Sequence, residues 1–253
     1  MESREIRYPV HDLIRSRWSP VAFSSKSVEP WKLCSLLEAA RWAPSSFNEQ
    51  PWRFIVATRD GEGEFQRLLE CLIPGNFEWA QNASVLMLSV AKLHFTHDGR
   101  PNRHAFHDVG LAVGNLILQA TALGICVHQM AGFDVEKARR IFAVPAGYEP
   151  VGGIALGYAA DAETLPERLQ KRQRSPRRRK PLEEIMFGYR WGQISPLIGH
   201  RSPDDNPYCS TGGGSDSAKR SVNERNGNLS LQKNKPRKRV ESRESERTSG
   251  NRG

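Results

Sequence analysis

The stretch Ala43–Val56, which reads APSSFNEQPWRFIV, decides the expected fold. Pro44 ends the preceding helix, because proline lacks a backbone N–H and disfavours the helical conformation in the residue before it. Hydrogen-bonding side chains then crowd the loop that Pro51 closes: Ser45, Ser46, Asn48 and Gln50. Aromatic and β-branched residues from Trp52 onward predict a β-strand. The loop therefore suits a flat heteroaromatic ligand, and its residues also fit an ordinary helix-to-strand turn.

Hydrophobic periodicity on both sides of this stretch predicts helices and strands in alternation. Helices are predicted over Ile6–Arg17, Glu29–Ala43, Phe65–Leu72 and Val109–Gly124. We expect Asp108 to cap the last of these, Pro74-Gly75 to end the third, and Asp134 to cap a further short helix. Apolar runs predict strands at Val85–Ala91, Ile125–His128 and Val151–Tyr158. The helix Val109–Gly124 is apolar on more than one face, so it must be buried on more than one side.

The basic charge is concentrated toward the C-terminus. The chain has 253 residues, a net charge of +9 and 38% hydrophobic residues. Residues 1–192 hold 25 basic and 21 acidic residues, whereas residues 193–253 hold 12 and 7. This last segment has too few bulky apolar side chains to offset the entropy cost of ordering it. We therefore predict a domain over residues 1–192 and a disordered, dispensable basic tail over 193–253.

Several function classes are disfavoured by the sequence. The cysteines lie far apart without a Cys-x-x-Cys pair, which indicates neither a zinc site nor a disulfide framework. The N-terminus lacks a signal-peptide core, and the uncharged run at Val109–Val127 is interrupted by polar residues and glycines. We expect a cytoplasmic protein without a membrane span. The mixed charges of the tail argue against a dedicated nucleic-acid arm, although the basic run Arg172–Lys180 leaves nucleic-acid binding open.

The loop APSSFNEQPW closely resembles the signature loop of the FMN-dependent nitroreductase family. Further landmarks of that family follow in order between Arg15 and Gly192, ending in RRRKPLEE and a Trp-Gly pair. The resemblance implies an α+β fold, in which helices sandwich a small, mostly antiparallel mixed sheet. It also implies a homodimer, with the helix Val109–Gly124 buried in the interface.

The resemblance implies a set of FMN-binding residues. Arg17 and Ser19 match an Arg-x-Ser element that binds the phosphate, and Arg177 and Arg179 close that site. The loop residues of the partner subunit would contact the same FMN: Pro44, Ser45, Ser46 and Asn48. Asn76 would face the flavin pyrimidine ring, and the backbone at Ala131 and Gly132 would approach the flavin. The family usually has a second basic residue two positions after the Ser, but this chain has Val21, so Arg15 is a candidate replacement.

The implied activity is an oxidoreductase reaction with NADH or NADPH as the reductant. A nitroaromatic, a quinone or a similar acceptor would then take the electrons from the flavin. Because the flavin carries the chemistry, no catalytic side chain is predicted. The alternatives are a flavin-binding protein without turnover and a protein that binds nucleic acid through its basic tail.

The segment His94–Asp108 contains two His-x-x-His pairs with adjacent aspartates. Such pairs occur in metal sites, but Gly99-Arg-Pro-Asn between the pairs breaks any single helix that could present them together. No metal is therefore predicted. In the resembled family this stretch leads to a lid-like region, which makes His104 and Phe106 candidates for lining the substrate site.

Overall fold

The computed structural model describes residues 6–200. The α-helices are α1 (Asp12–Ser16), α2 (Pro30–Arg41), α3 (Glu64–Leu69), α4 (Pro74–Ala80), α5 (Ala105–Ala122), α6 (Val135–Ile141) and α7 (Glu167–Gln173). The strands are β1 (Trp52–Thr58), β2 (Val85–Lys92), β3 (Cys126–Met130) and β4 (Tyr148–Gly157). Short 3-10 helices lie at η1 (Ser46–Asn48), η2 (Ala162–Thr164) and η3 (Leu182–Glu184).

The strands form one sheet in the order β1-β2-β4-β3, and each neighbouring pair is antiparallel. The prediction of a small, mostly antiparallel sheet is confirmed. Its mixed character is not found, because residues 6–200 contain no parallel strand pair. A bulge between Ser89 and Val90 interrupts the pairing of the two central strands.

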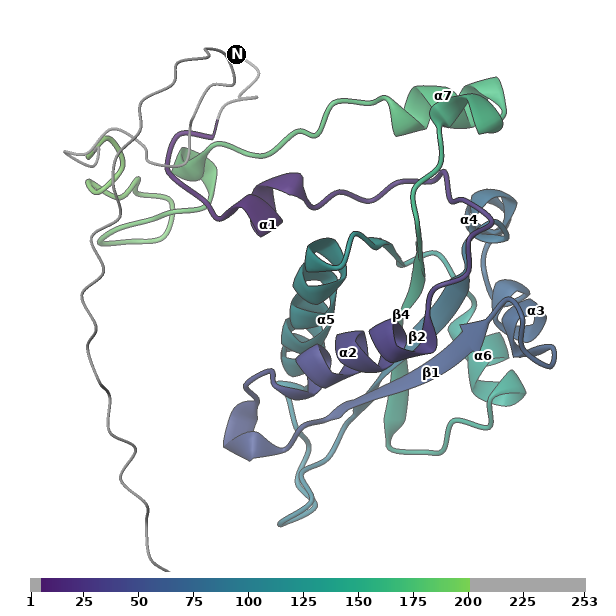
Figure 1. Cartoon of the computed structure of the whole chain (residues 1–253). Helices are drawn as coiled ribbons and strands as arrows, with labels where there is room; N and C mark the ends of the chain where they lie inside the picture. The colour runs from purple at the N-terminus through teal and green to yellow at the C-terminus, as the bar shows by residue number, and fades with distance from the viewer. Residues whose placement is uncertain (1–5, 201–253) are drawn as a thin grey trace, which may run out of the picture. The chain divides into compact units, whose positions relative to one another are not determined.

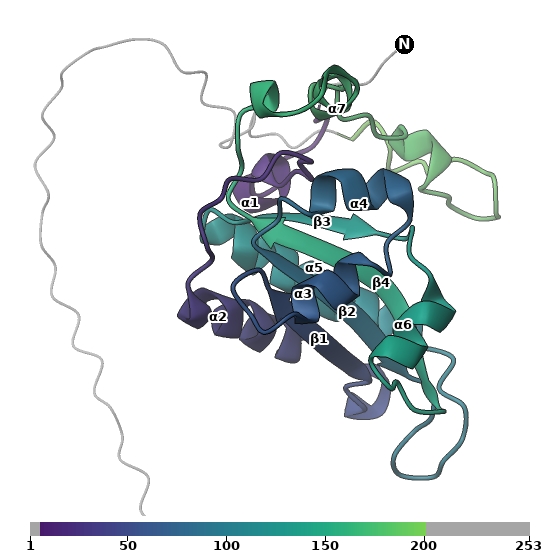
Figure 2. The same ribbon diagram turned by 90° about the vertical axis from the view of Figure 1, so that its right-hand side faces the viewer.

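Helices cover both faces of the sheet, as Figures 1 and 2 show. Strand β2 supplies buried side chains to both sides. Val85 and Met87 join the core formed with α2 and α5, whereas Leu86 and Leu88 join the core formed with α3 and α4. This alternation follows from the two-residue period of a strand. A strand buried on both faces is largely apolar, which explains why β2 was recognisable from sequence; its buried Ser89 donates a hydrogen bond to the Gly152 oxygen.

Helix α5 begins at Ala105, with His104 as its N-cap residue, so the prediction that Asp108 caps this helix was wrong. The Asn102 side chain accepts the His104 N–H at 3.0 Å, which orders the chain before the helix. Gly124 follows the end of the helix with φ +70°, as expected for a glycine that terminates a helix. One face of α5 is buried between α2 and the sheet, while Phe106 and Leu111 stay exposed.

Two other predicted elements differ from the structure, both at prolines. The N-terminal helix was predicted over Ile6–Arg17, but α1 begins only at Asp12, since Pro9 provides no N–H for a longer helix. Pro74 was expected to end a helix, but it occupies the first turn of α4. Proline is favoured at this position because its missing N–H has no helical partner in any case.

The described chain continues past the predicted boundary at Gly192. Phe187 and Ile194 form an isolated β-bridge, and the Gly199 N–H donates to the Tyr8 hydroxyl at 2.9 Å. The predicted tail over residues 193–253 therefore begins within the described structure, and its part from 201 onward lies outside it. Within residues 6–200, no helix is both long and apolar enough to cross a membrane.

Candidate functional site

The loop between α2 and β1 has a strained backbone. Phe47, Asn48 and Gln50 adopt φ values of 52°, 53° and 51°, in the left-handed region that non-glycine residues avoid. Two hydrogen bonds hold this conformation: the Ser45 hydroxyl accepts the Gln50 N–H at 2.9 Å, and the Asp108 carboxylate accepts the Ser46 N–H at 3.0 Å. Backbone strain of this kind persists only where surrounding contacts enforce it, and it concentrates at functional sites.

A buried ion pair fixes the same loop from its other end. The Glu49 side chain is 5% exposed, and its carboxylate lies 2.8 Å from Lys92 Nζ. It also accepts the N–H of Thr96 at 2.8 Å and the hydroxyl of Thr96 at 2.5 Å. Burial alone raises the pKa of Glu49, but the hydrogen bonds from Lys92 and Thr96 outweigh it and hold the pKa at about 2. The carboxylate is thus ionised at neutral pH.

Arginine residues from both ends of the domain meet beside α1. Arg177 donates to the backbone oxygens of Arg15 at 3.0 Å and of Arg17 at 2.7 Å. The Arg17 guanidinium lies 3.1 Å from the Ser19 hydroxyl. Burial lowers the pKa of Arg17, and the positive charges of Arg179 and Arg177 lower it further, so the three guanidinium groups are close together. Within residues 6–200 none of the three pairs with a carboxylate.

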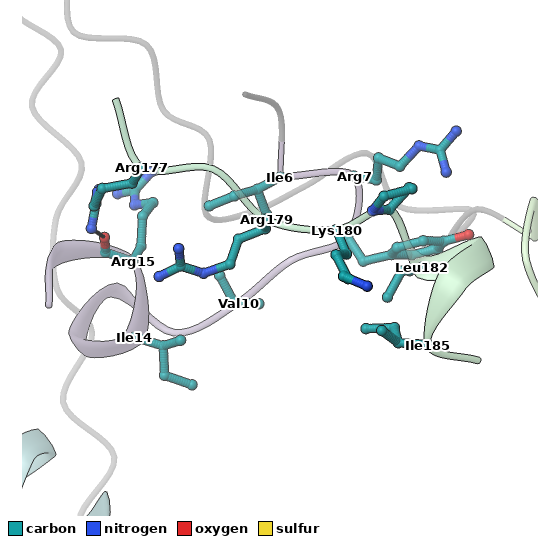
Figure 3. A pocket seen from close by; sticks show the side chains of 12 residues that line it. Ile6, Arg7, Val10, Ile14, Arg15, Arg177, Arg179, Lys180, Leu182 and Ile185 are labelled. Atoms are coloured by element: carbon teal, nitrogen blue, oxygen red, sulfur yellow. Dashed lines mark hydrogen bonds between the residues drawn. The ribbon is translucent and has the colours of Figure 1, made fainter. Parts of the chain in front are cut away.

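Arg177 and Arg179 line a cavity of about 580 Å³ together with Arg15, whereas Arg17 is not part of its lining. Figure 3 shows Arg15, Arg177 and Arg179 at one end of it, and Arg7, Lys180 and Ile185 at the other. Arg15 pairs with Asp12, Arg7 with Glu183 and Lys180 with Glu184. Arg177 and Arg179 have no carboxylate partner among residues 6–200, and two such guanidinium groups suit an anion at this end of the cavity.

A second group of predicted residues meets at the start of α4. The Asn76 amide donates to the Gly132 carbonyl at 3.0 Å, and the Ile73 N–H donates to the same oxygen at 3.2 Å. A β-carbon at Gly132 would lie 2.5 Å from Ile73 Cδ1 and 2.8 Å from Asn76 Nδ2. A β-carbon at this position would therefore require the side chains of Ile73 and Asn76 to shift. The structure thus brings together Asn76 and Gly132, which are 56 residues apart in sequence.

We expect a G132A substitution to displace Asn76 and Ile73 and to destabilise the fold by about 1–3 kcal/mol, as overpacking of a tight site does. The free energy of unfolding in urea measures this effect. G75A is the matched control, because a β-carbon at this exposed glycine of α4 meets nothing within 4 Å. Equal stability of G132A and the parent would show that the Asn76 contact is not rigid.

Sequence analysis did not identify a third group of residues, on β3 and α7. His128 packs against the buried Trp79 ring with 4.4 Å between centroids, and its Nδ1 lies 2.7 Å from the Pro20 oxygen. Its Nε2 lies 3.4 Å from Arg172 Nη2. A neutral ring that donates from Nδ1 to Pro20 satisfies both contacts. Burial lowers the pKa of His128, and the Arg172 charge lowers it further.

The lowered pKa of His128 predicts a loss of stability in acid. The unfolded chain takes up a proton as the pH falls through about 6.5, whereas the folded state takes it up only at a lower pH. Stability therefore falls as the pH drops from about 6.5 toward the folded-state pKa. The amide of H128N can still donate to the Pro20 oxygen but does not titrate. We expect the melting temperature of H128N to fall less between pH 7.5 and 5.5 than that of the parent. The exposed His104→Gln is the control, and an identical pH dependence of H128N and the parent would contradict the prediction.

The two halves of the predicted site lie far apart within one chain. The loop at η1 contacts the first turn of α5 through Asp108, whereas Pro20 contacts His128, which follows the end of α5. In Figure 1, α1 lies near one end of α5, and the unlabelled turn before β1, which contains η1, lies near the other end. The 18 residues of α5 span about 27 Å. One chain therefore does not bring Arg17, Arg177 and Arg179 to Ser45, Ser46 and Asn48.

The histidine-rich segment has structural contacts of its own. His97 lies 3.1 Å from the Asp98 carboxylate and beside Phe47 and Phe95, and His107 lies 3.3 Å from Asp108. In the part of the chain that the structure covers, no three His, Cys, Asp or Glu residues are grouped to hold a metal ion. His104 and Phe106 are exposed at the start of α5, near the Ser46 contact.

Known proteins are similar to this chain in fold and in sequence. A solved structure described as an oxidoreductase containing FMN is 36% identical, with a TM-score of 0.71 over 76% of this chain and 97% of that one. An uncharacterised 15.4 kDa protein of Mycolicibacterium smegmatis is 38% identical over 147 residues, which cover 55% of this chain and 97% of that protein. The major NAD(P)H-flavin oxidoreductase of Aliivibrio fischeri is 27% identical over 70% of this chain and 96% of its own length.

The family model of the nitroreductase family matches residues 14–158. The match includes Arg17, Ser19, the loop at η1, Asn76 and Gly132, and so most of the contacts described above. Because it spans more than half of the sequence, the chain belongs to the nitroreductase family.

Proposed function

We propose that this protein is an FMN-dependent oxidoreductase that takes a hydride from NADH or NADPH and passes electrons to a nitroaromatic, a quinone or a similar acceptor. The observation that carries the proposal is the convergence of Arg17, Arg177 and Arg179 without a carboxylate partner among residues 6–200. Such a group suits a phosphate dianion, which accepts several charge-assisted hydrogen bonds at once.

Membership of the nitroreductase family makes this chain an oxidoreductase enzyme. The FMN-containing structural neighbour and the NAD(P)H-flavin oxidoreductase relative support FMN as the cofactor and NAD(P)H as the reductant. FMN, when bound, supplies the group that accepts a hydride and passes the electrons on.

The residues present fit FMN at both ends of that molecule. The three arginines Arg17, Arg177 and Arg179, here called the arginine cluster, and the Ser19 hydroxyl offer hydrogen-bond donors to the phosphate. At the other end, Asn76 uses its amide N–H₂ on Gly132 and keeps its amide oxygen free to accept the N–H of the flavin pyrimidine ring. Ala131, beside Gly132, is exposed, so its backbone is accessible to a flat ligand.

The protein residues hold and orient the reactants in this proposal. The arginine cluster binds the phosphate, Asn76 fixes the plane of the ring, and the loop Pro44–Asn48 covers it. His104 and Phe106 stay candidates for lining the acceptor site, since both are exposed beside that loop. No side chain is required as a general acid or base at the transferred hydride, so we assign no catalytic residue.

The proposed assembly is a homodimer with each FMN at the interface. The arginine cluster of one subunit and the loop of the other would then meet, although they lie near opposite ends of α5 within one chain (Figure 1). The exposed apolar residues Phe106 and Leu111 on α5 support burial against a second copy. A monomer by light scattering at micromolar concentration, with FMN still bound, would contradict this assembly.

The function is tested on the purified full-length protein. We expect a yellow protein whose flavin absorbance disappears when NADPH or NADH is added without oxygen, and returns when a quinone is added. A yellow protein that neither reductant bleaches would indicate flavin binding without turnover. A colourless protein that does not bind added FMN, and that retards DNA in a gel, would overturn the proposal.

A further inference from the structure

Arg172 differs from every other basic residue of α7 and its C-cap. Arg168 pairs with Glu78, Lys171 with Glu167 and Arg174 with Glu163. The Arg172 guanidinium instead lies 5.6 Å from the centre of the Trp79 ring and 3.4 Å from His128 Nε2. It has no carboxylate partner among residues 6–200, so its positive charge is not neutralised there.

The surroundings of Arg172 hold this charge in a defined place. Trp79 is fully buried, and His128 is fixed by its 2.7 Å contact with Pro20. The next residue, Gln173, accepts the Val21 N–H at 2.8 Å, which attaches the end of α7 to the segment that follows Ser19. A planar guanidinium stacks on an aromatic face and keeps its charge, since the ring attracts it without cancelling it.

The position complements the arginine cluster. The segment from Trp18 to Ser25 contains no basic residue, and Val21 in its middle is buried. The end of α7 brings Arg172 beside this segment, through the contacts of Gln173 with Val21 and of His128 with Pro20. Arg15, the replacement considered from sequence, pairs with Asp12 on the other side. Trp79, which holds Arg172, lies three residues after Asn76 on α4, and residues at this spacing share one side of a helix.

We propose that Arg172 contacts the pyrimidine end of the bound flavin and stabilises its reduced form. This inference rests on the proposed function. A hydride brings two electrons and one proton to a neutral ring system, which therefore gains one negative charge. A cation held near the carbonyl oxygens of that ring attracts the reduced cofactor more strongly than the oxidised one, and so raises its reduction potential.

The test compares R172Q with the full-length parent, by the affinity for oxidised FMN and by the reduction potential of bound FMN against a reference dye. We expect R172Q to retain oxidised FMN, but to lose about tenfold of its preference for reduced over oxidised FMN. This change lowers the two-electron potential by about 30 mV. R172K keeps the charge and should recover most of the preference. R174Q removes a neighbouring, paired arginine and should leave the potential unchanged.

The outcomes separate this inference from the proposed function. A parent that binds FMN, together with R172Q at the parent's potential, overturns the role of Arg172 and leaves the proposed function intact. A parent that binds no FMN contradicts both. If R172Q loses thermal stability, the reduction potential of R172K decides between the two explanations. R172K keeps the positive charge, so a potential as low as that of R172Q would show that the charge of Arg172 is not the cause.

Discussion

The R177A/R179A double variant is expected to elute from gel filtration without FMN and to bind added FMN at least a hundredfold more weakly than the parent. Charge-assisted hydrogen bonds contribute about 1.5–3 kcal/mol each, so loss of two corresponds to about 3–6 kcal/mol. A factor of ten in affinity corresponds to about 1.4 kcal/mol. Quenching of FMN fluorescence measures both dissociation constants.

The control for this experiment removes charge without touching the cluster. K171A/R174A takes two cations from α7 and its C-cap that already pair with Glu167 and Glu163, and it should bind FMN like the parent. Arg177 also donates to the backbone oxygens of Arg15 and Arg17, so its loss affects the local structure as well as the phosphate contact. R179A alone therefore tests the loss of a phosphate contact without the loss of these backbone contacts. Added salt should weaken FMN binding less in the double variant, which keeps fewer charge contacts to screen. A double variant that stays yellow would show that the phosphate binds elsewhere.

Local sequence rules predicted those helices, strands and caps whose conformation depends mainly on their own residues. The apolar run of β2, the helix α2 and the Asp134 cap of α6, which accepts the Lys137 N–H at 2.8 Å, were all recognisable in this way. The prolines were harder to interpret. Pro74 can end one helix or begin the next, and only tertiary packing of Trp79 and Ala80 decides that it begins α4.

The sequence named candidate site residues where a motif carried them, but it did not show the contacts between distant segments. The arginines, Asn76 and Gly132 were each named from a family motif, and their role in binding FMN stays a prediction; the contact between Asn76 and Gly132 comes from the structure. The role of Asp108 depends on Ser46, 62 residues away in the chain, and Arg172 depends on Trp79 and His128. A single sequence gives no sign of such pairs, since each residue taken alone fits a helix cap or a solvated surface.

The pair of Glu49 and Lys92 carries the largest expected effect on stability. We expect E49A to lower the free energy of unfolding by about 2–3 kcal/mol, slightly below the value for a fully buried pair, because Lys92 remains 20% exposed. The variant removes the acceptor for Lys92 and for both groups of Thr96, and so frees the strained loop that contains Phe47 and Asn48. Urea unfolding of the FMN-free protein measures the effect apart from ligand binding.

The matched control is E38A, which breaks an exposed pair with Arg41 on α2 and should change stability little.

The pKa of Glu49 is about 2 in the folded protein, below its ordinary value of 4.5. The contribution of Glu49 to stability is therefore complete above about pH 4.5 and is lost as the pH falls toward 2, so the parent should approach E49A in stability over this range.

The substitution K92M leaves the Glu49 carboxylate buried without its partner, so it should destabilise the parent strongly. In the E49A background this carboxylate is already absent, so K92M should have almost no effect. Equal effects of K92M in both backgrounds would mean that Glu49 and Lys92 act independently, and that the loop is held by Asp108 and Ser45 alone.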